Sequence, residues 1–170
     1  MQTTSIRLYA FNFSDARTYL TATAFIVGNI LFPQLCHLLP QGGMTWLPIY
    51  FFTLIAAYKY GWKTGLLTAV ASPIINSFLF GMPMTAALPA ILLKSILLAL
   101  SAGLVAQRYS KVSILLLVAV VLLYQVMGTL GEWALKGSFW MAVQDFRLGV
   151  PGMLLQVFGG YAFIHSIIRK

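Results

Sequence analysis

Residues 86–106 read AALPAILLKSILLALSAGLVA and residues 112–131 read VSILLLVAVVLLYQVMGTLG, with the basic turn QRYSK between them. Each apolar run is about 20 residues long, the length that an α-helix needs to cross the hydrocarbon core of a bilayer. The runs are continuous, whereas the strands of a membrane barrel alternate apolar and polar residues. The stretch therefore predicts two membrane-spanning helices joined by a short turn.

Similar apolar segments lie on both sides of this pair. The whole chain is 60% hydrophobic and only 8% charged, whereas about a quarter of the residues of a soluble domain are charged. We therefore expect an all-α polytopic membrane protein, with residues 1–170 forming a single membrane domain. Its six spans are predicted at about 19–39, 44–60, 65–81, 86–106, 112–131 and 149–168. Proline interrupts two of them, so we expect kinking or early unwinding at Pro33 and a break at Pro73.

Basic residues occur on every second loop between these segments, and the loops between them hold few. Cytoplasmic loops of membrane proteins carry an excess of lysine and arginine. The alternation therefore predicts a multi-pass membrane protein with both termini in the cytoplasm. The residues concerned are Arg7, Arg17, Lys59, Lys63, Arg108, Lys111, Arg169 and Lys170.

The net charge of +8 does not indicate nucleic-acid binding, because the basic residues are spread over short loops and form no continuous patch. Anionic lipid headgroups or an acidic partner explain them more simply. The pattern of His37, His165 and the carboxylates indicates no acid–base pair, and the chain has no glycine-rich phosphate loop. We expect neither an enzyme nor a resident cofactor.

Lys94 lies near the middle of the predicted fourth span, where a charged side chain costs at least about 2.5 kcal/mol. It must face the interior of the bundle or a wet cavity. Glu132, at the outer end of the fifth span, is the carboxylate expected to reach inward, while Asp145 and Arg147 could pair with each other in the following loop. Lys94 and Glu132 either form a structural bridge or bind an acidic or carbonyl group of a substrate, and both roles hold if a ligand inserts into the pair.

Other polar residues in the apolar segments also need partners. Asn76 and Gln125 bond either a neighbouring helix or a ligand. At the outer end of the first span, His37 lies beside Cys36, and a thiol and an imidazole can ligate soft metals. Cys36 is a weak candidate for such ligation, because a lone thiol in apolar surroundings usually acts as a small hydrophobic group.

Aromatic residues gather on the predicted outer side. Trp46, Tyr50 and Trp133 form either an interfacial belt or a stacking surface for a ring-containing solute, and Trp133 also belongs to a loop that could act as a cap. Small residues form stripes at helical spacing: Ser95, Ala99 and Gly103 are expected to pack the bundle. The stripe of Ala22, Ala24 and Gly28 in the first span either packs the bundle or docks a partner.

Six short helices, both ends inside and a small-residue stripe in the first helix together resemble the substrate-binding S component of energy-coupling factor (ECF) transporters. The resemblance covers nearly the whole chain, and the segment from Pro33 to Pro83 is also similar to bacterial proteins grouped with these components. The family signature alanine-x-x-x-alanine is matched by Ala24-Phe25-Ile26-Val27-Gly28, with glycine in place of the second alanine.

Membership of this family implies a location in a bacterial cytoplasmic (inner) membrane and a vitamin or related micronutrient bound near the outer face. It also implies docking to a transmembrane coupling subunit that carries two ATPases. On this reading the substrate contacts Lys94, Asn76, Trp46, Tyr50, Glu132, Trp133 and His37, and Ala22, Ala24 and Gly28 seat the coupling subunit. The loop after the first span is shorter than in several family members, and no signature for riboflavin, thiamine, biotin or folate is present. Cobalamin is considered because Cys36 could ligate cobalt. The alternative is a small scaffold protein of envelope or cell-shape machinery without transport activity.

Overall fold

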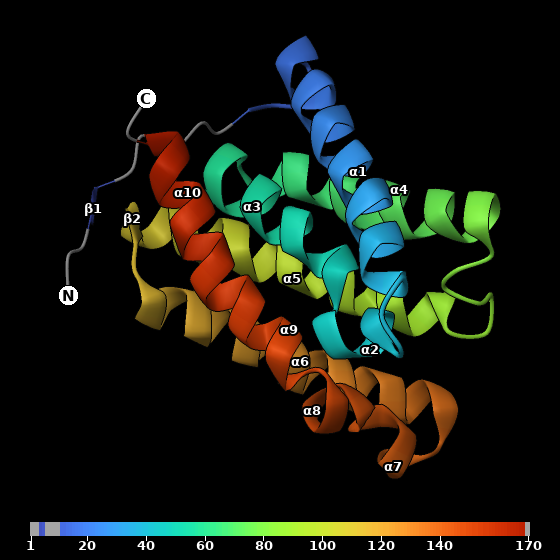
Figure 1. Ribbon diagram of the computed structural model, residues 1–170. Helices are drawn as coiled ribbons and strands as arrows, with labels where there is room; N and C mark the ends of the chain where they lie inside the picture. Colours follow the sequence, from blue (N-terminus) through green and yellow to red (C-terminus); the bar gives the residue numbers. More distant parts are fainter. Residues whose placement is uncertain (1–3, 6–10, 169–170) are drawn as a thin grey trace.

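Four long helices form the frame of the molecule (Figure 1). The structure is a computed structural model that describes residues 4–5 and 11–168. Arg7, Arg169 and Lys170, which contributed to the predicted topology, lie outside the described residues. The long helices are α1 (Ala16–His37), α4 (Trp62–Phe80), α5 (Leu88–Tyr109) and α6 (Ile114–Lys136). The predicted all-α fold class is confirmed, because most of the described residues are helical.

Three of these helices, α1, α5 and α6, are long and apolar enough to cross a membrane. The segments predicted as the second and sixth spans are instead divided into shorter pieces. The second consists of α2 (Gly42–Trp46), the 3₁₀ turn η1 (Pro48–Tyr50) and α3 (Phe51–Tyr60). The sixth consists of α9 (Val150–Leu154), the π-helix η2 (Leu155–Gly159) and α10 (Gly160–Ile168). Between α6 and α9 lie α7 (Phe139–Ala142) and α8 (Gln144–Leu148).

The helices begin and end where local sequence favours it. The Asp15 side chain accepts a hydrogen bond from the backbone N–H of Arg17 at the start of α1, and the Ser113 hydroxyl accepts one from Leu116 at the start of α6. Gly137 ends α6 with φ +69°, a left-handed conformation that glycine adopts without a steric cost. α6 therefore continues past the predicted end of its span and carries Glu132 and Lys136 on its last turns.

Neither proline inside a long helix ends it. α1 continues through Pro33 to His37, and α4 continues through Pro73 to Phe80. The predicted unwinding at Pro33 and the predicted break at Pro73 are therefore wrong. Proline is tolerated in apolar helices when a neighbouring group satisfies the carbonyl that loses its partner, and Asn76 supplies such a group to α1, as described below.

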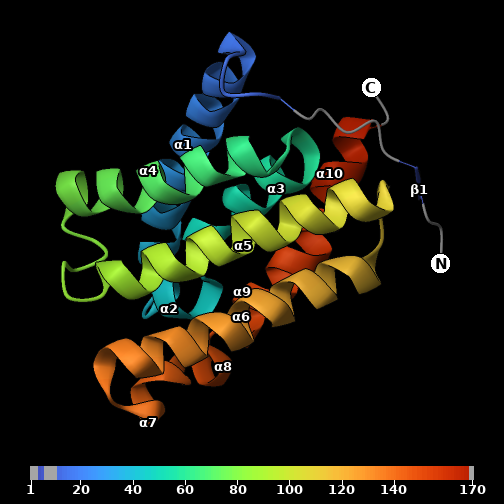
Figure 2. The same cartoon turned by 180° about the vertical axis from the view of Figure 1, so that it is seen from behind.

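The connections gather at two ends of the bundle (Figure 1, Figure 2). The turn at Gly61, the turn between α5 and α6 and the antiparallel pair of β1 (Thr4–Ser5) with β2 (Lys111–Val112) lie at one end. We call this the basic end, because Lys63 and Lys111 belong to it. The loop 81–87, α2 and α7 lie toward the other end, which we call the cap end.

The short helix α3 lies at the centre of the molecule and packs against α1, α4, α5 and α10. Leu54, Ile55 and Tyr58 on α3 are completely buried. α4 and α5 approach closely at Gly103, where an added Cβ would lie 2.7 Å from the Cα of Trp62. Ser95 and Ala99, which share a face of α5 with Gly103, are buried as well. The small-residue stripe of α5 therefore lies inside the bundle.

The outer faces of the long helices expose large apolar side chains. Leu20 on α1 is 76% exposed, Phe78 on α4 is 87% exposed and Leu115 on α6 is 67% exposed. Contiguous apolar surface of this kind is uncommon on monomeric soluble proteins. It suits a lipid environment, in agreement with the composition of the chain.

Candidate functional site

A cluster of four charged side chains lies inside the bundle near the cap end. The Lys94 ammonium group, from α5, donates to Oε2 of Glu132 on α6 and, at 2.8 Å, to Oδ2 of Asp145 on α8. Oε1 of Glu132 accepts a further hydrogen bond of 2.5 Å from Lys136, one turn later on α6. We call Lys94, Glu132, Lys136 and Asp145 the ion cluster.

The ion cluster is electrically balanced, because it joins two ammonium groups to two carboxylates. Lys94 is only 2% exposed, whereas the side chains of Asp145 and Lys136 are 18% and 27% exposed. A buried charge is tolerated when it is paired and hydrogen-bonded. Lys94, the most buried of these charges, thus has two carboxylate partners, and Asp145 and Lys136 are more exposed to solvent.

Gly128 makes the passage of Lys94 toward this cluster possible. A Cβ at Gly128 would lie 2.5 Å from Cγ of Lys94 and 3.4 Å from its Cδ and Cε. The aliphatic part of the lysine therefore lies across α6 at the glycine, one turn before Glu132. Because glycine has no side chain, the lysine stem can pass at this position and place its ammonium group beside the carboxylate of Glu132.

The partner of Asp145 differs from the predicted one. Asp145 binds Lys94, and the guanidinium of Arg147 lies over the ring of Trp140, with 4.3 Å from Cζ to the ring centroid. Glu132 is therefore not the only carboxylate that reaches inward among the described residues. The reason is that the loop after α6 folds back toward the bundle as α7 and α8, so that Asp145 on α8 reaches Lys94 on α5. Through this contact Lys94 ties the cap segment, α7 and α8, to the core of the bundle.

Uncharged polar groups lie deeper on the same side of the bundle. The Tyr124 hydroxyl on α6 donates to Oε1 of Gln156 on η2 at 2.8 Å, and the rings of Tyr124 and Tyr50 lie 5.5 Å apart. Several other buried polar atoms have no hydrogen-bond partner among the described residues. They are both amide atoms of Gln125, the hydroxyls of Thr129 and Ser95, and Nε2 of Gln156.

Asn76 belongs to a separate polar group between α1, α3 and α4. Its Nδ2 donates to the backbone carbonyl of Asn29 at 2.9 Å. In a regular helix this carbonyl would accept from the N–H of residue 33, but Pro33 has none. The Asn29 side chain in turn donates to Thr53 at 2.9 Å and to Ser72 at 3.3 Å. Asn76 thus bonds a neighbouring helix backbone, which is one of its two predicted roles, and its hydrogen-bond partners differ from those of Lys94.

The polar residues at the end of α1 contact different parts of the bundle. Gln34 donates to Asn76 at 3.5 Å, and Cys36 is a buried free thiol. The His37 ring lies against Gly43 at the start of α2, where an added Cβ would meet Nε2 at 2.6 Å. Within the described part of the chain no group of three His, Cys, Asp or Glu residues could hold a metal ion.

The predicted aromatic residues occupy different environments. Tyr50 is buried beside Tyr124, whereas Trp46 is half-buried. Trp133 is 45% exposed and contacts Phe139 edge-on, with 5.4 Å between ring centroids. Trp133 thus lies on the outer side of α6, away from the side chain of Lys94, which suits an interfacial aromatic belt.

The three small residues predicted to dock a partner do not share one face of α1: Ala22 lies on the buried side, and Ala24 and Gly28, four residues apart, lie on another. Ala22 is 2% exposed, and an added Cβ at Gly28 would lie 3.0 Å from the ring of Phe52, so both contact the bundle. Ala24 is exposed, on the same side of the helix as Leu20 and Val27. Of the three, only Ala24 is placed to contact another protein.

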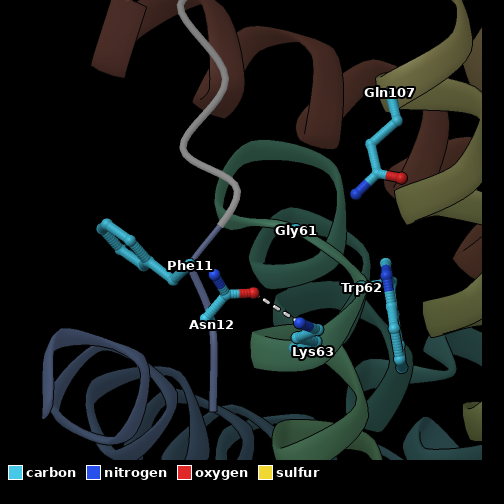
Figure 3. A pocket seen from close by; sticks show the side chains of 6 residues that line it. All are labelled: Phe11, Asn12, Gly61, Trp62, Lys63 and Gln107. Atoms are coloured by element: carbon cyan, nitrogen blue, oxygen red, sulfur yellow. Dashed lines mark hydrogen bonds between the residues drawn. The ribbon is translucent and has the colours of Figure 1, made fainter. Parts of the chain in front are cut away.

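A cavity of about 80 Å³ lies at the basic end (Figure 3). Its lining residues are Phe11, Asn12, Gly61, Trp62, Lys63 and Gln107, and Lys63 donates to Asn12 at 2.5 Å. None of the predicted site residues lines it. It separates the segment before α1 from the start of α4.

The sequence singles out Lys94, Glu132, Tyr50 and Gln125, and the structure buries all four. The sequence does not show the inward position of Asp145 or the burial of Thr129 and Gln156. The signal for Gln156 was an amide within an apolar run, as for Gln125. No protein-family model, curated protein or solved structure matches the chain.

Proposed function

We propose that the chain is the solute-binding membrane subunit of an ECF-type importer for a vitamin or related micronutrient. The observation that carries this proposal is the buried ion cluster, in which Lys94 joins the core helices α5 and α6 to the cap segment. Ionisable residues inside apolar bundles are costly and usually functional. On α6, Gln125 lies two turns before Glu132, and both of its amide atoms are buried without a partner among the described residues.

In the proposed mechanism the cap segment controls access to the interior. Asp145 is the more exposed of the two carboxylates on Lys94, so hydration lowers the cost of releasing this bond first. Lys94 then remains neutralised by Glu132 while α7 and α8 move away from α5. A solute enters between the helices and the cap segment closes over it when Asp145 rebinds.

The proposed topology has six crossings of a bacterial cytoplasmic membrane, with both termini in the cytoplasm. The arrangement of the connections supports it, because the turns at residues 61 and 110–113 lie at one end and those at 38–41, 81–87 and 137–143 toward the other. The broken segments cross together with their neighbours, α2 and η1 extending α3, and α9 and η2 extending α10. Irregular backbone at membrane depth is tolerated where protein buries it.

Docking to a transmembrane coupling subunit with two ATPases is assigned to the exposed face of α1. Ala24 lies there between Leu20 and Val27, and a small residue lets a partner helix approach closely. We expect Ala24→Trp to prevent co-purification of the coupling subunit without changing thermal stability. Ala22→Trp is the comparison, since it places the same ring inside the bundle and should unfold the protein.

The direct experiment is a thermal-stability screen of the purified protein in lipid nanodiscs against a panel of vitamins. A ligand at one hundred times its dissociation constant stabilises the folded state by about 2.7 kcal/mol, which is readily measured. One compound should raise the melting temperature, and the variant Lys94→Met/Glu132→Gln/Asp145→Asn should weaken this response. A flat response across the panel, with no compound co-purified, contradicts the proposal.

A scaffold protein of the cell envelope is the second candidate, and one observation favours it. Lys94, Glu132 and Asn76 all have complete partners within the structure, so helix packing alone can account for them. The same triple variant separates the two functions. A scaffold should keep its cellular function when the charges are removed together, whereas an importer should lose solute binding.

A further inference from the structure

Three buried, uncharged polar side chains belong to α6 and the π-helix η2, two elements that pack against each other. Gln125 and Thr129 are four residues apart on α6 and so lie on one face of it. Gln156 belongs to η2, and its Oε1 accepts the 2.8 Å hydrogen bond from Tyr124 that ties the two elements together. We call Gln125, Thr129 and Gln156 the seam residues.

The seam residues hold an unusual concentration of unpartnered atoms. Both amide atoms of Gln125, the hydroxyl of Thr129 and Nε2 of Gln156 are buried and have no hydrogen-bond partner among the described residues. Gln125 and Gln156 are completely buried, and Thr129 is 6% exposed. Buried polar groups in folded proteins nearly always have partners. Four such atoms from two packed elements therefore indicate a molecule that binds between them.

The charges of the neighbouring groups restrict what this molecule can be. Lys94 is paired with Glu132 and Asp145, and Glu132 is paired with Lys94 and Lys136, so the ion cluster offers no unpaired charge. The unpartnered atoms themselves are amide and hydroxyl groups, which both donate and accept. An uncharged solute satisfies them, whereas a charged one would bring a buried charge with no partner.

Two further features of the seam suit a ring-bearing solute. The buried ring of Tyr124, whose hydroxyl binds Gln156, lies 5.5 Å from the buried ring of Tyr50, and flat rings pack favourably against such aromatic groups. η2 is a π-helical stretch of five residues within an otherwise α-helical segment. Single π-turns of this kind occur frequently at functional sites.

We infer that the seam residues bind an uncharged ring compound that carries both hydrogen-bond donors and acceptors, such as an amide, lactam or hydroxyl-bearing heterocycle. This inference rests on the proposed function and names the chemical class of its solute. The ion cluster closes the site and fastens the cap segment, and it does not contact the solute through an unpaired charge. Specificity lies with Gln125, Thr129 and Gln156.

The test uses full-length protein in lipid nanodiscs and isothermal titration with two sets of probes. The uncharged set is riboflavin, pyridoxine and nicotinamide, and the charged set is thiamine, biotin and pantothenate. We expect binding within the uncharged set, weakened about tenfold or more by Thr129→Val and by Gln125→Leu, since each removes a hydrogen-bonding group of similar size. Ser95→Ala is the matched control, because Ser95 is also unpartnered but lies on the face of α5 that contains Gly103 and meets α4.

Melting temperatures without ligand provide a second readout. Replacing an unpartnered buried polar group by an apolar one of the same shape is neutral or stabilising. Thr129→Val and Gln125→Leu should therefore melt at or above the wild-type temperature while binding less. A fall in both the melting temperature and the binding affinity would indicate that the seam residues are structural and would overturn the inference.

The failure of this inference is distinguishable from failure of the proposed function. Binding that is confined to the charged set, lost in Lys94→Gln and unchanged in Thr129→Val, would overturn the inference and leave an importer subunit. Binding of neither set, with the melting temperature independent of every compound, would overturn both. Equal weakening by Ser95→Ala and Thr129→Val would also count against a specific seam site.

Discussion

Lys94→Met is the substitution that tests the ion cluster most sharply, because it keeps the length of the side chain and removes its ammonium group. The change deletes hydrogen bonds to Glu132 and Asp145 in a site where Lys94 is only 2% exposed. Removing one partner of a buried ion pair costs about 3–5 kcal/mol. Glu132 retains Lys136, and Asp145 can reach water, so we expect a loss near the lower limit, about 3 kcal/mol.

The loss can be measured as the free energy of unfolding in mixed micelles with an increasing fraction of a denaturing detergent. Lys136→Met is the matched control, since it removes an ammonium group from the same carboxylate. The side chain of Lys136 is 27% exposed and pairs within one turn of helix, so its removal should cost less than about 1 kcal/mol.

A third variant separates loss of the lysine from the cost of unpaired carboxylates. Lys94→Met/Glu132→Gln/Asp145→Asn leaves no buried charge without a partner and should recover most of the lost stability. The reasoning is refuted if Lys94→Met destabilises the protein no more than Lys136→Met does. It is also refuted if the triple variant is less stable than Lys94→Met.

Three other predictions concern helix packing and topology. Asn76→Leu leaves the Asn29 carbonyl without its partner and should cost about 1–3 kcal/mol of unfolding free energy. The cost should be smaller in a Pro33→Ala background, because residue 33 then supplies its own N–H to this carbonyl. Equal costs in both backgrounds would contradict the assignment. Gly128→Leu places carbon atoms where the Lys94 stem lies and should destabilise the protein by about 1–3 kcal/mol, more than Gly128→Ala, as measured by detergent unfolding. Reporter fusions should place both termini in the cytoplasm, and termini on opposite sides of the membrane would refute the six-crossing topology.

The pair α5 and α6 could be predicted from the sequence because each forms one long apolar run between turn residues. The division of the second and sixth predicted spans into short helices could not, because an apolar run does not reveal whether lipid or protein surrounds it. α3 is short and almost wholly buried by other helices, so its apolar residues pack against protein and not against lipid. The pattern of apolar residues likewise does not indicate the π-turn in η2.

The pairing of Lys94 with Glu132 follows from the rule that a buried charge needs an opposite one. The position of Asp145 does not, because it depends on the path of two short helices in a polar loop. Asn76 needs a hydrogen-bond partner by the same rule, but the sequence does not show which one. In the structure the partner is the carbonyl of Asn29, which Pro33 leaves without its usual N–H. The sequence does not single out Gln156, because one glutamine in an apolar segment resembles a packing residue.

Native mass spectrometry of the protein released from nanodiscs tests the central claim most directly, that the interior beside α6 and η2 holds a small solute. The account predicts a discrete additional mass of one small uncharged compound on the wild-type protein. This mass should be absent from the variant with both Gln125→Leu and Thr129→Val and retained in Ser95→Ala. A wild-type protein that carries no added mass, even after incubation with the vitamin panel, would contradict the account.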